Sequence, residues 1–498
     1  MKVKDNIRYI STRGHEEEVN SAQAIIRGLA PDGGLYVPAV LPEMSFKLTS
    51  MGGVAYRDIA YKVIHSFFTD FSLEDLHKCT DGAYDEKFDT PLIAPVTHTS
   101  EAEFLELYHG RTAAFKDMAL SILPYLLINS LRKERVDKNV AILTATSGDT
   151  GKAALEGFAD VTGTDIIVFY PKKGISEIQR RQMVTQRGAN THVYGILGNF
   201  DDAQKGVKEI FADAEFAKAL AARGYLLSSA NSINIGRLVP QIAYYVAAYI
   251  RLVEAGRIGN GDKINLVVPT GNFGNILAGW YAAQIGLPVN KLICASNENN
   301  VLTDFINTGV YDTNRKFVIT SSPSMDILVS SNLERLLWHL SGGNSQEITG
   351  YMKLLKKNGK YRLKPDTRAA MNEMFYGGYA TGRSVNAAIT KLWNEERYLI
   401  DTHTAVGYKV YLNYKKQTGD DTVTVIASTA SAYKFADKIA ACLGLPKEED
   451  SFAYFNAIKK KTGVPIPEGL RRLAQKPILH DLSVKPGDMI KAVDYVLK

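Results

Sequence analysis

A short β-branched run, a loop of small polar residues and an apolar helix-like stretch follow one another three times along the chain. The runs are NVAIL, INLVV and TVTVIA, and the loops after them are TATSGDTG, PTGNFG and STAS. Strands that alternate with helices favour parallel sheets with helices on both faces, because parallel neighbours need a crossover connection. Ligands bind such sheets at the carboxyl ends of the strands. The pattern therefore predicts an α/β protein whose site includes these three loops.

Composition limits the classes of partner. A chain of 498 residues, 45% hydrophobic and 22% charged, can form two or three domains with substantial cores. Its net charge of +6 is small and its charges are interspersed, so we expect a small-molecule ligand and no nucleic acid. Cys79, Cys294 and Cys442 are far apart, which argues against disulfides or a cysteine-built metal site. We therefore expect no metal. With no apolar run long enough for a bilayer and no signal-like start, we also expect a cytoplasmic protein.

Breaks in the pattern suggest domain limits. Residues 1–92, with the Gly-Pro-rich GLAPDGGLYVPAVLP, form the expected N-terminal domain. The α/β pattern occupies 93–345 and 401–498, which we predict to be the catalytic domains. A third part, 346–400, reads as helices interrupted by the glycine-rich YGGYATGRS, and we expect a helical insertion or subdomain there.

The stretch HGRTAAFKDMAL places Lys116 between an aromatic residue and Asp117 at the start of a helix-like run. Most lysines are solvated, and an acidic residue in a first turn suits the helix dipole without any function. However, Phe115 and Met118 would desolvate the ammonium group and lower its pKa, which an amine needs in order to attack an aldehyde. Lys116 is therefore a candidate nucleophile.

Two of the loops could bind anions. PTGNFGN joins a buried strand to a helix, where exposed N–H groups and the helix dipole favour a phosphate, although a tight turn would need the same glycines. TSGDTGKA could bind a carboxylate, or its Ser147 or Asp149 could simply cap a helix. Neither loop matches a dinucleotide fingerprint or a P-loop. A lysine able to form a Schiff base, a phosphate loop and a hydroxyl-rich loop at one sheet edge together indicate a pyridoxal-phosphate site.

Motifs across nearly the whole chain resemble those of the threonine synthase family. In order they are YISTRG, GLAPDGGLYVP, HGRTAAFKD, ATSGDTG, YPKKGIS, SANSINIGR, PTGNFGN, DTHTAVG and STA. The resemblance implies the pyridoxal-phosphate fold type II, which is similar to the tryptophan synthase β subunit, with parallel sheets flanked by helices and a small N-terminal domain. It also implies pyridoxal 5'-phosphate as the cofactor.

The same resemblance assigns site residues. Lys116 would bind the cofactor covalently and act as the catalytic base. The cofactor phosphate would be held by Gly271, Asn272, Phe273 and Asn275, and the pyridine nitrogen by Thr429. The substrate would be bound by Ser147, Gly148 and Asp149 at its carboxylate and by Thr150, Asn231, Ser232 and Arg237 at its phosphate.

The implied reaction converts O-phospho-L-homoserine and water to L-threonine and phosphate, in a monomer or homodimer. Alternatives are a serine or threonine dehydratase or a β-replacement synthase of the same fold, neither of which needs a second phosphate site, and a catalytically silent paralogue. Three residues depart from the family pattern: Arg111 replaces a common proline and would add charge near Lys116, Asn275 replaces aspartate, and Thr402 replaces the proline of DPH. The role of His403 stays open between a site residue and a structural histidine.

Overall fold

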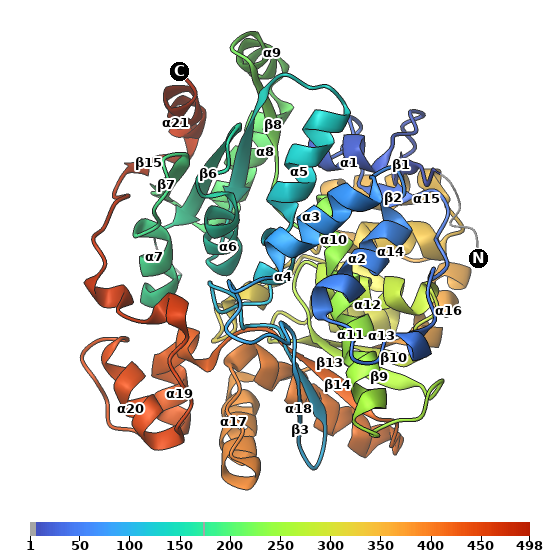
Figure 1. Cartoon of the computed structure of the whole chain (residues 1–498), viewed down its shortest axis with the longest axis vertical. Helices are drawn as coiled ribbons and strands as arrows, with labels where there is room; N and C mark the ends of the chain where they lie inside the picture. Colours follow the sequence, from blue (N-terminus) through green and yellow to red (C-terminus); the bar gives the residue numbers. More distant parts are fainter. Residues whose placement is uncertain (1–5, 173–174) are drawn as a thin grey trace.

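Two sheets form the centre of the molecule (Figure 1). The structure, a computed structural model, describes residues 6–172 and 175–498, so Lys173 and Gly174 of the YPKKGIS motif lie outside the described residues. Within these ranges the larger sheet has six strands, in the order β13 (Phe375–Tyr379), β10 (Val289–Ser296), β9 (Ile264–Pro269), β14 (Thr424–Ser428), β4 (Glu103–Glu106) and β3 (Val96–His98). The smaller has five, in the order β15 (Ser483–Val484), β7 (Thr191–Ile196), β6 (Thr164–Pro171), β5 (Asn139–Ala145) and β8 (Tyr225–Ser228).

All neighbouring strands of both sheets are parallel except β3 and β4. The three predicted strands are confirmed as β5, β9 and β14, the last beginning two residues later than predicted, at Thr424. Their loops follow the carboxyl ends of the strands, as predicted. The fold class, α/β with parallel sheets flanked by helices, is confirmed.

Side chains of the strands alternate between two cores, because successive residues of a strand face opposite sides of a sheet. In β5, Val140 and Ile142 belong to the main core with α6 (Asp149–Phe158), while Ala141 and Leu143 pack with α8 (Phe200–Ala212) and α21 (Met489–Val496). Both faces of this sheet are therefore covered. Other elements are the short strand β11 (Val310–Asp312) and the helices α7 (Glu177–Val184), α9 (Ala214–Ala222), α13 (Val301–Thr308), α14 (Leu333–Leu340), α18 (Thr402–Thr418), α19 (Ala436–Cys442) and α20 (Ala453–Thr462).

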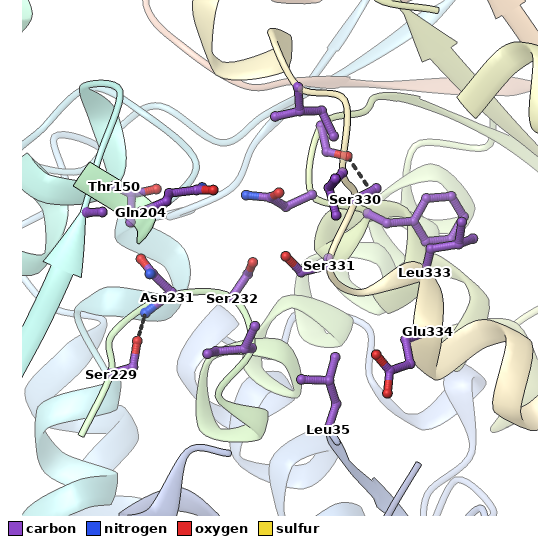
Figure 2. Close-up of a pocket in the computed structure, with 18 of the residues that line it drawn as sticks. Leu35, Thr150, Gln204, Ser229, Asn231, Ser232, Ser330, Ser331, Leu333 and Glu334 are labelled. Carbon is purple, nitrogen blue, oxygen red and sulfur yellow. Dashed lines mark hydrogen bonds between the residues drawn. The ribbon is translucent and has the colours of Figure 1, made fainter. Parts of the chain in front are cut away.

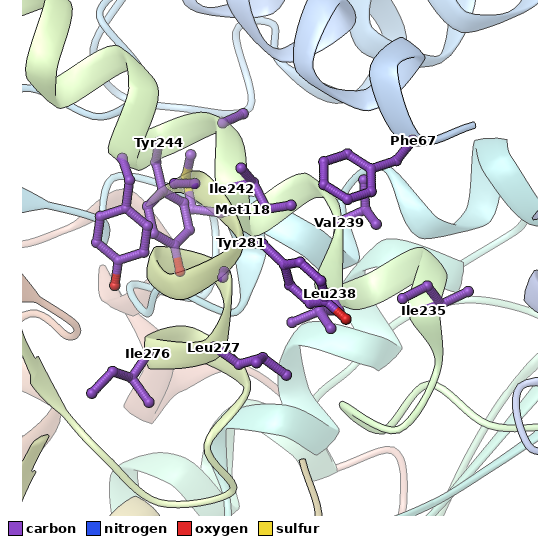
Figure 3. Close-up of a cluster of buried hydrophobic side chains, with 14 of the residues drawn as sticks. Phe67, Met118, Ile235, Leu238, Val239, Ile242, Tyr244, Ile276, Leu277 and Tyr281 are labelled. Atoms are coloured by element: carbon purple, nitrogen blue, oxygen red, sulfur yellow. The ribbon is translucent and has the colours of Figure 1, made fainter. Parts of the chain in front are cut away.

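One apolar cluster packs beneath three segments that carry candidate site residues (Figure 3). Met118 of α4 (Asp117–Leu120), Leu238 of α10 (Ile235–Leu238), Tyr244 of α11 (Pro240–Glu254) and Leu277 of α12 (Gly274–Gln284) are all fully buried in it. Burying one such side chain contributes about 1.5–3 kcal/mol. The starts of α4 and α12 and the whole of α10 are thus fixed relative to one another by packing.

The N-terminal region packs on this core. It contains the antiparallel pair β1 (Tyr9–Ser11) and β2 (Tyr36–Pro38) and the helices α1 (Ser21–Arg27), α2 (Tyr56–Phe67) and α3 (Leu73–Ala83). Helix α1, which begins with a capping box of Asn20 and Gln23, packs on α5 (Leu123–Lys133), and α2 packs on α11. The boundary at residue 92 stays a prediction.

The segment 346–400 differs from the helical insertion that we predicted. It does contain α16 (Pro365–Met374), α17 (Gly382–Glu396) and most of α15 (Ser345–Asn358), but also β12 (Lys360–Arg362) and β13, an edge strand of the larger sheet. A Cβ on Gly377 would lie 3.0 Å from the Thr303 carbonyl oxygen, and one on Gly378 would lie 2.7 Å from Val410 Cγ1. These glycines therefore let α13 and α18 pack against the strand, whereas in the sequence they read as a turn.

No helix in the described residues combines the length and the apolar composition needed to cross a lipid bilayer.

Candidate active site

A cavity of about 890 Å³ is lined by all three predicted loops. Figure 2 shows one part of it, where Thr150, Asn231, Ser232 and Ser331 lie around the same space. All the predicted site residues except Gly148 line it: Lys116, Ser147, Asp149, Thr150, Asn231, Ser232, Arg237, Gly271, Asn272, Phe273, Asn275 and Thr429. The structure thus brings together residues that are more than 300 positions apart in the chain.

Gly148 shapes the loop instead of lining the cavity. It is the N-cap of α6 with a φ of +142°, and a Cβ there would lie 2.6 Å from the Gln179 side chain. Its N–H and that of Gly151 both donate to Thr146 Oγ1, at 2.9 Å. The capping alternative for this loop is wrong, because neither Ser147 nor Asp149 caps the helix; the Asp149 side chain is used elsewhere.

Lys116 lies immediately before α4, and the loop that carries it is tied to the loop after β14. Phe115 N–H donates to the Thr429 carbonyl oxygen at 2.8 Å, and Ser431 N–H donates to that of Ala113 at 3.0 Å. The lysine is 8% exposed, and its Nζ is 4.5 Å from the centre of the Phe115 ring. Burial lowers the pKa of Lys116 to about 8, although the Asp149 carboxylate opposes the change.

Lys116, Asp149 and Lys434 form a buried group that we call the lysine cluster. Asp149 Oδ1 accepts from Lys434 Nζ at 2.7 Å and from Gln179 Nε2 at 2.8 Å, while Oδ2 is 3.8 Å from Lys116 Nζ. Burial acts to raise the pKa of Asp149, but the two ammonium groups hold it well below its usual range. Asp149 is therefore ionised, and its charge is shared by two lysines.

The glycine loop before α12 is held from outside by the segment 324–332. Ser330 Oγ donates to the Gly271 carbonyl oxygen at 2.8 Å, and Asn332 N–H donates to that of Asn272 at 3.1 Å. A Cβ on Gly271 would lie 2.6 Å from the Ser324 carbonyl oxygen, so any side chain here displaces that segment. Phe273 adopts a left-handed conformation, φ +66°, which turns the chain into the helix.

Asn275 presents an unsatisfied donor beside this loop. Its Oδ1 accepts from the hydroxyls of Tyr244 and Tyr245, the latter at 2.6 Å, which directs the amide NH₂ away from them. Nδ2 is buried and has no hydrogen-bond partner among the described residues. The first N–H groups of α12 also lack partners within the helix. This corner of the cavity fits an anion such as a phosphate.

Arg237 is a second buried donor. It is 4% exposed, its Nη1 donates to the Ala230 carbonyl oxygen at 2.7 Å, and its Nη2 is 3.5 Å from Thr150 Oγ1. Its Nε has no hydrogen-bond partner, and no carboxylate of the described residues lies within 4.0 Å of the guanidinium. Burial lowers the pKa of Arg237 to about 10, so the group stays charged at neutral pH. A buried cation without a carboxylate fits an anionic ligand. We call Arg237 and Asn275 the anion-binding pair.

Asn332, which we did not predict, connects two of the predicted loops. Its Nδ2 donates to Ser232 Oγ and to the Asn272 carbonyl oxygen, both at 3.0 Å. Ser232 therefore lies beside the glycine loop. A lone Asn in the run SSNLE carries no sequence signal of this role.

His403 also lines the cavity, and its contacts are now visible. Its Nδ1 is 2.8 Å from Asp401 Oδ2, and its Nε2 accepts the Ser324 N–H at 3.2 Å. This network assigns the proton to Nδ1. Ser324 Oγ in turn is 3.3 Å from Asp149 Oδ2, so His403 holds the segment that borders both the lysine cluster and the glycine loop.

Arg111 needs a correction. We expected it to add charge near Lys116, but its side chain is exposed, does not line this cavity and lies 3.4 Å from Glu156. Of the two neighbours expected to desolvate Lys116, Phe115 does so, whereas Met118 points into the apolar cluster of Figure 3.

The N-terminal region supplies one wall of the cavity. Leu35 and Glu334 face it in Figure 2. Glu334 accepts two hydrogen bonds from the Arg13 guanidinium, both at 2.9 Å, and one from Thr12 Oγ1 at 2.6 Å. Its neighbour Arg335, fully buried, donates to the carbonyl oxygens of Tyr36 and Ile233. Contacts from the first forty residues therefore help to form the wall of the cavity.

Comparison with known proteins identifies this arrangement. Three family models match: "Threonine synthase N terminus" over residues 8–84, "Pyridoxal-phosphate dependent enzyme" over 104–376 and "Threonine synthase, C-terminal" over 404–481. The threonine synthase of Pseudomonas aeruginosa is 37% identical over 436 residues, covering 87% of this chain and 90% of that protein. The chain belongs to the threonine synthase family.

Human threonine synthase-like 1 is 38% identical over 461 residues, which are 88% of this chain and 61% of the human protein. The chain thus spans less than two thirds of that relative's length. Among solved structures, a threonine synthase from Brucella melitensis with bound PLP has a TM-score of 0.86 and 33% identity, covering 99% of each chain. The yeast threonine synthase has a TM-score of 0.87 and 30% identity, covering 100% of this chain and 99% of that one.

These matches confirm the predicted family, the type II fold and pyridoxal phosphate as the family's cofactor. The residues present fit that cofactor. A buried lysine with a lowered pKa can bind an aldehyde, and the open donor of Asn275 beside a helix N-terminus fits a phosphate. Among the described residues, no group of three or more His, Cys, Asp or Glu could hold a metal ion.

Proposed function

We propose that the chain is a threonine synthase, which converts O-phospho-L-homoserine and water to L-threonine and phosphate. The observation that carries this proposal is Arg237, a buried guanidinium with an open Nε and no carboxylate partner among the described residues. The cofactor phosphate accounts for the glycine loop, so Arg237 is left for an anion of the substrate. A planar guanidinium can bind a phosphate through two charge-assisted hydrogen bonds.

Each predicted residue has a role in this proposal. Lys116 would hold the cofactor covalently, Thr429 would bond its ring nitrogen, and its phosphate would be bound by Gly271, Asn272, Phe273 and Asn275. Ser232 belongs with the substrate phosphate in the prediction, but its contact with Asn332 also brings it to the glycine loop. Thr150, Asn231 and Arg237 would bind the substrate phosphate. The substrate carboxylate would be bound by the N–H groups of Ser147 and Asp149, since the Asp149 side chain pairs with lysines and the Gly148 N–H already donates to Thr146. Gly148 would shape this loop.

Proton transfers centre on Lys116. As a free amine, Lys116 would remove the proton from Cα of the substrate, and its pKa of about 8 suits a base near neutral pH. The bound cofactor supplies the electron sink for the resulting carbanion. A second proton would then leave Cβ and phosphate would leave Cγ, and Arg237 would favour this departure by binding the phosphate. Cγ would be reprotonated, after which water would add its hydroxyl group at Cβ while a proton returns to Cα.

Two alternatives make different demands on the site. A dehydratase or β-replacement synthase has no use for a second phosphate group, and Arg237 weighs against both. A catalytically silent member of the family is consistent with the similarity to threonine synthase-like 1, but it gives no reason to retain a buried Lys116 of lowered pKa.

The test is to load the purified chain with pyridoxal phosphate and measure phosphate and threonine formed from O-phospho-L-homoserine. We expect equal amounts of both, and none with Lys116→Ala. L-Serine and L-threonine serve as competing substrates: 2-oxoacid formation from them without phosphohomoserine turnover would make the chain a dehydratase. The expected cytoplasmic location and the monomeric or dimeric state stay predictions.

A further inference from the structure

Lys434 is a completely buried lysine with no part in the steps above. It lies in the 3₁₀ turn Ala432–Phe435, directly after the loop of β14, and has 0% exposure. Its Nζ lies 2.7 Å from Asp149 Oδ1 and donates to the Thr112 carbonyl oxygen at 2.9 Å. Burying an ammonium group is costly unless it is paired, and lysine is rarely found fully buried. The energetic cost of burying this ammonium group indicates that Lys434 has a specific role.

The two oxygens of Asp149 have different partners. Lys434 and Gln179 both bind Oδ1, and this fixes the plane of the carboxylate. Oδ2 is then left facing the cavity, 3.8 Å from Lys116 Nζ and 3.3 Å from Ser324 Oγ. Without Lys434, Gln179 and Ser324 would still contact this carboxylate, but Lys116 would be its one ammonium partner among the described residues.

We propose that Lys434 is a positioning residue that engages Asp149 and thereby increases the fraction of Lys116 that is present as the neutral, reactive amine. This inference rests on the proposed function only in taking Lys116 as the reactive amine. It assigns Lys434 no contact with substrate or cofactor.

The charges around Lys116 support this role. Asp149 of α6 and Asp117 of α4 favour its ammonium form, whereas Arg237 of α10 and Lys434 disfavour it. Asp117 stabilises the Lys116 ammonium form only weakly, because burial raises the pKa of its carboxyl to about 6. Thr112 also donates to this carboxyl through both its N–H and its hydroxyl. Lys434 therefore acts twice, through its own charge and by sharing the charge of Asp149.

The experiment measures the reactivity of Lys116 in the full-length, cofactor-free chain. Acetic anhydride acylates only neutral amines, so the labelling rate of the Lys116 peptide, followed by mass spectrometry from pH 6 to 10, reports the protonation of this lysine. In Lys434→Met we expect the midpoint to move to higher pH and the rate at pH 7 to fall roughly tenfold, the factor set by one pKa unit. An unchanged or lower midpoint would overturn the inference.

Lys152→Met is the matched control. Lys152 is also a buried lysine, but its Nζ is 2.8 Å from Glu156 and it does not line the cavity. Its removal should leave the Lys116 midpoint unchanged; an equal shift would mean that the Lys434 effect is a general consequence of losing a buried lysine, and would also overturn the inference.

A second pair of variants serves if Lys434→Met does not fold. Replacing a buried ion pair by neutral groups of similar size is often tolerated, so Asp149→Asn can be compared with Asp149→Asn/Lys434→Met. The double variant should label more slowly below its midpoint, because it lacks the second ammonium group. Equal rates would mean that Lys434 acts on Lys116 through Asp149 alone, whereas faster labelling of the double variant would overturn the inference. None of these readouts uses phosphohomoserine, so absence of threonine formation would contradict the proposed function without affecting this result.

Discussion

Two members of the lysine cluster, Lys116 and Asp149, line the same cavity as the anion-binding pair, but the cluster and the pair satisfy their polar groups in opposite ways. Asp149 lies between two ammonium groups and accepts from Gln179, so the cluster is complete within the protein. Arg237 and Asn275 each keep a buried donor without a partner among the described residues. Polar groups that pair with one another fix geometry before a ligand arrives, whereas open donors are completed by the ligand. The comparison separates the group that we propose to react from the groups that we propose to bind phosphates.

The largest expected effect belongs to the lysine cluster. Lys116→Ala removes the only amine proposed to bind the cofactor, so covalent attachment should be lost and turnover should fall by at least ~10²-fold, the lower range for a general base. Reduction with borohydride followed by peptide mapping measures the attachment. A borohydride-stable adduct on another lysine of the unmodified chain would remove Lys116 from this role.

The anion-binding pair should show a smaller loss, confined to one substrate. Arg237→Ala should lower kcat/KM for phosphohomoserine roughly 10- to 100-fold, the ~1.5–3 kcal/mol of a hydrogen bond to a charged group. Arg237→Lys should recover part of it, since an ammonium group keeps the charge but not the two-pronged geometry. The visible spectrum of the bound cofactor should stay unchanged; loss of that band would assign Arg237 to the cofactor.

The two regions should also differ in their response to pH. The pKa of Lys116 is lowered to about 8, so the rate of covalent cofactor uptake by the cofactor-free chain should rise about tenfold per pH unit up to pH 8 and level off above it. The pKa of Arg237, about 10, predicts no change in phosphate binding by the guanidinium over pH 6–8. Uptake that keeps rising to pH 10, as for an ordinary lysine, would contradict the lowered pKa.

The smallest expected effect concerns stability. Arg237→Met removes an incompletely paired buried cation at the cost of one hydrogen bond, so we expect the free energy of unfolding of the cofactor-free chain to rise by about 1 kcal/mol. Arg335→Met is the matched control, because that buried guanidinium donates to the Tyr36 and Ile233 carbonyl oxygens and its loss should destabilise. Both are measured by denaturant unfolding. A clear loss of stability in Arg237→Met would mean that Arg237 has a structural use.

The strands, their loops and the meeting of the candidate residues at one cavity could be predicted from the sequence for a physical reason. A parallel sheet covered on both faces needs continuous apolar strands, and a ligand at its edge needs small polar loops, so both leave local patterns. Lys434 leaves none: AYKF reads as an ordinary amphipathic turn, and only the fold shows that its ammonium group meets Asp149, 285 positions earlier in the chain. Asn332 is similar. The strand β13 was missed because its glycines serve the packing of two helices, which is not a local property.

The first turn of α14 bears on how this chain can be divided. The family models separate an N-terminal part ending at residue 84 from a pyridoxal-phosphate part beginning at 104. Yet Glu334 takes its hydrogen bonds from Thr12 and Arg13, and Arg335 gives one of its own to Tyr36. Separating the two parts would leave the Glu334 carboxylate and the Arg335 guanidinium without these partners, on adjacent residues beside Ile233. The segment that each family model matches is therefore smaller than the unit that forms the cavity. If the N-terminal part is exchanged with that of a relative, the new part must supply hydrogen-bond donors to Glu334 and an acceptor for Arg335.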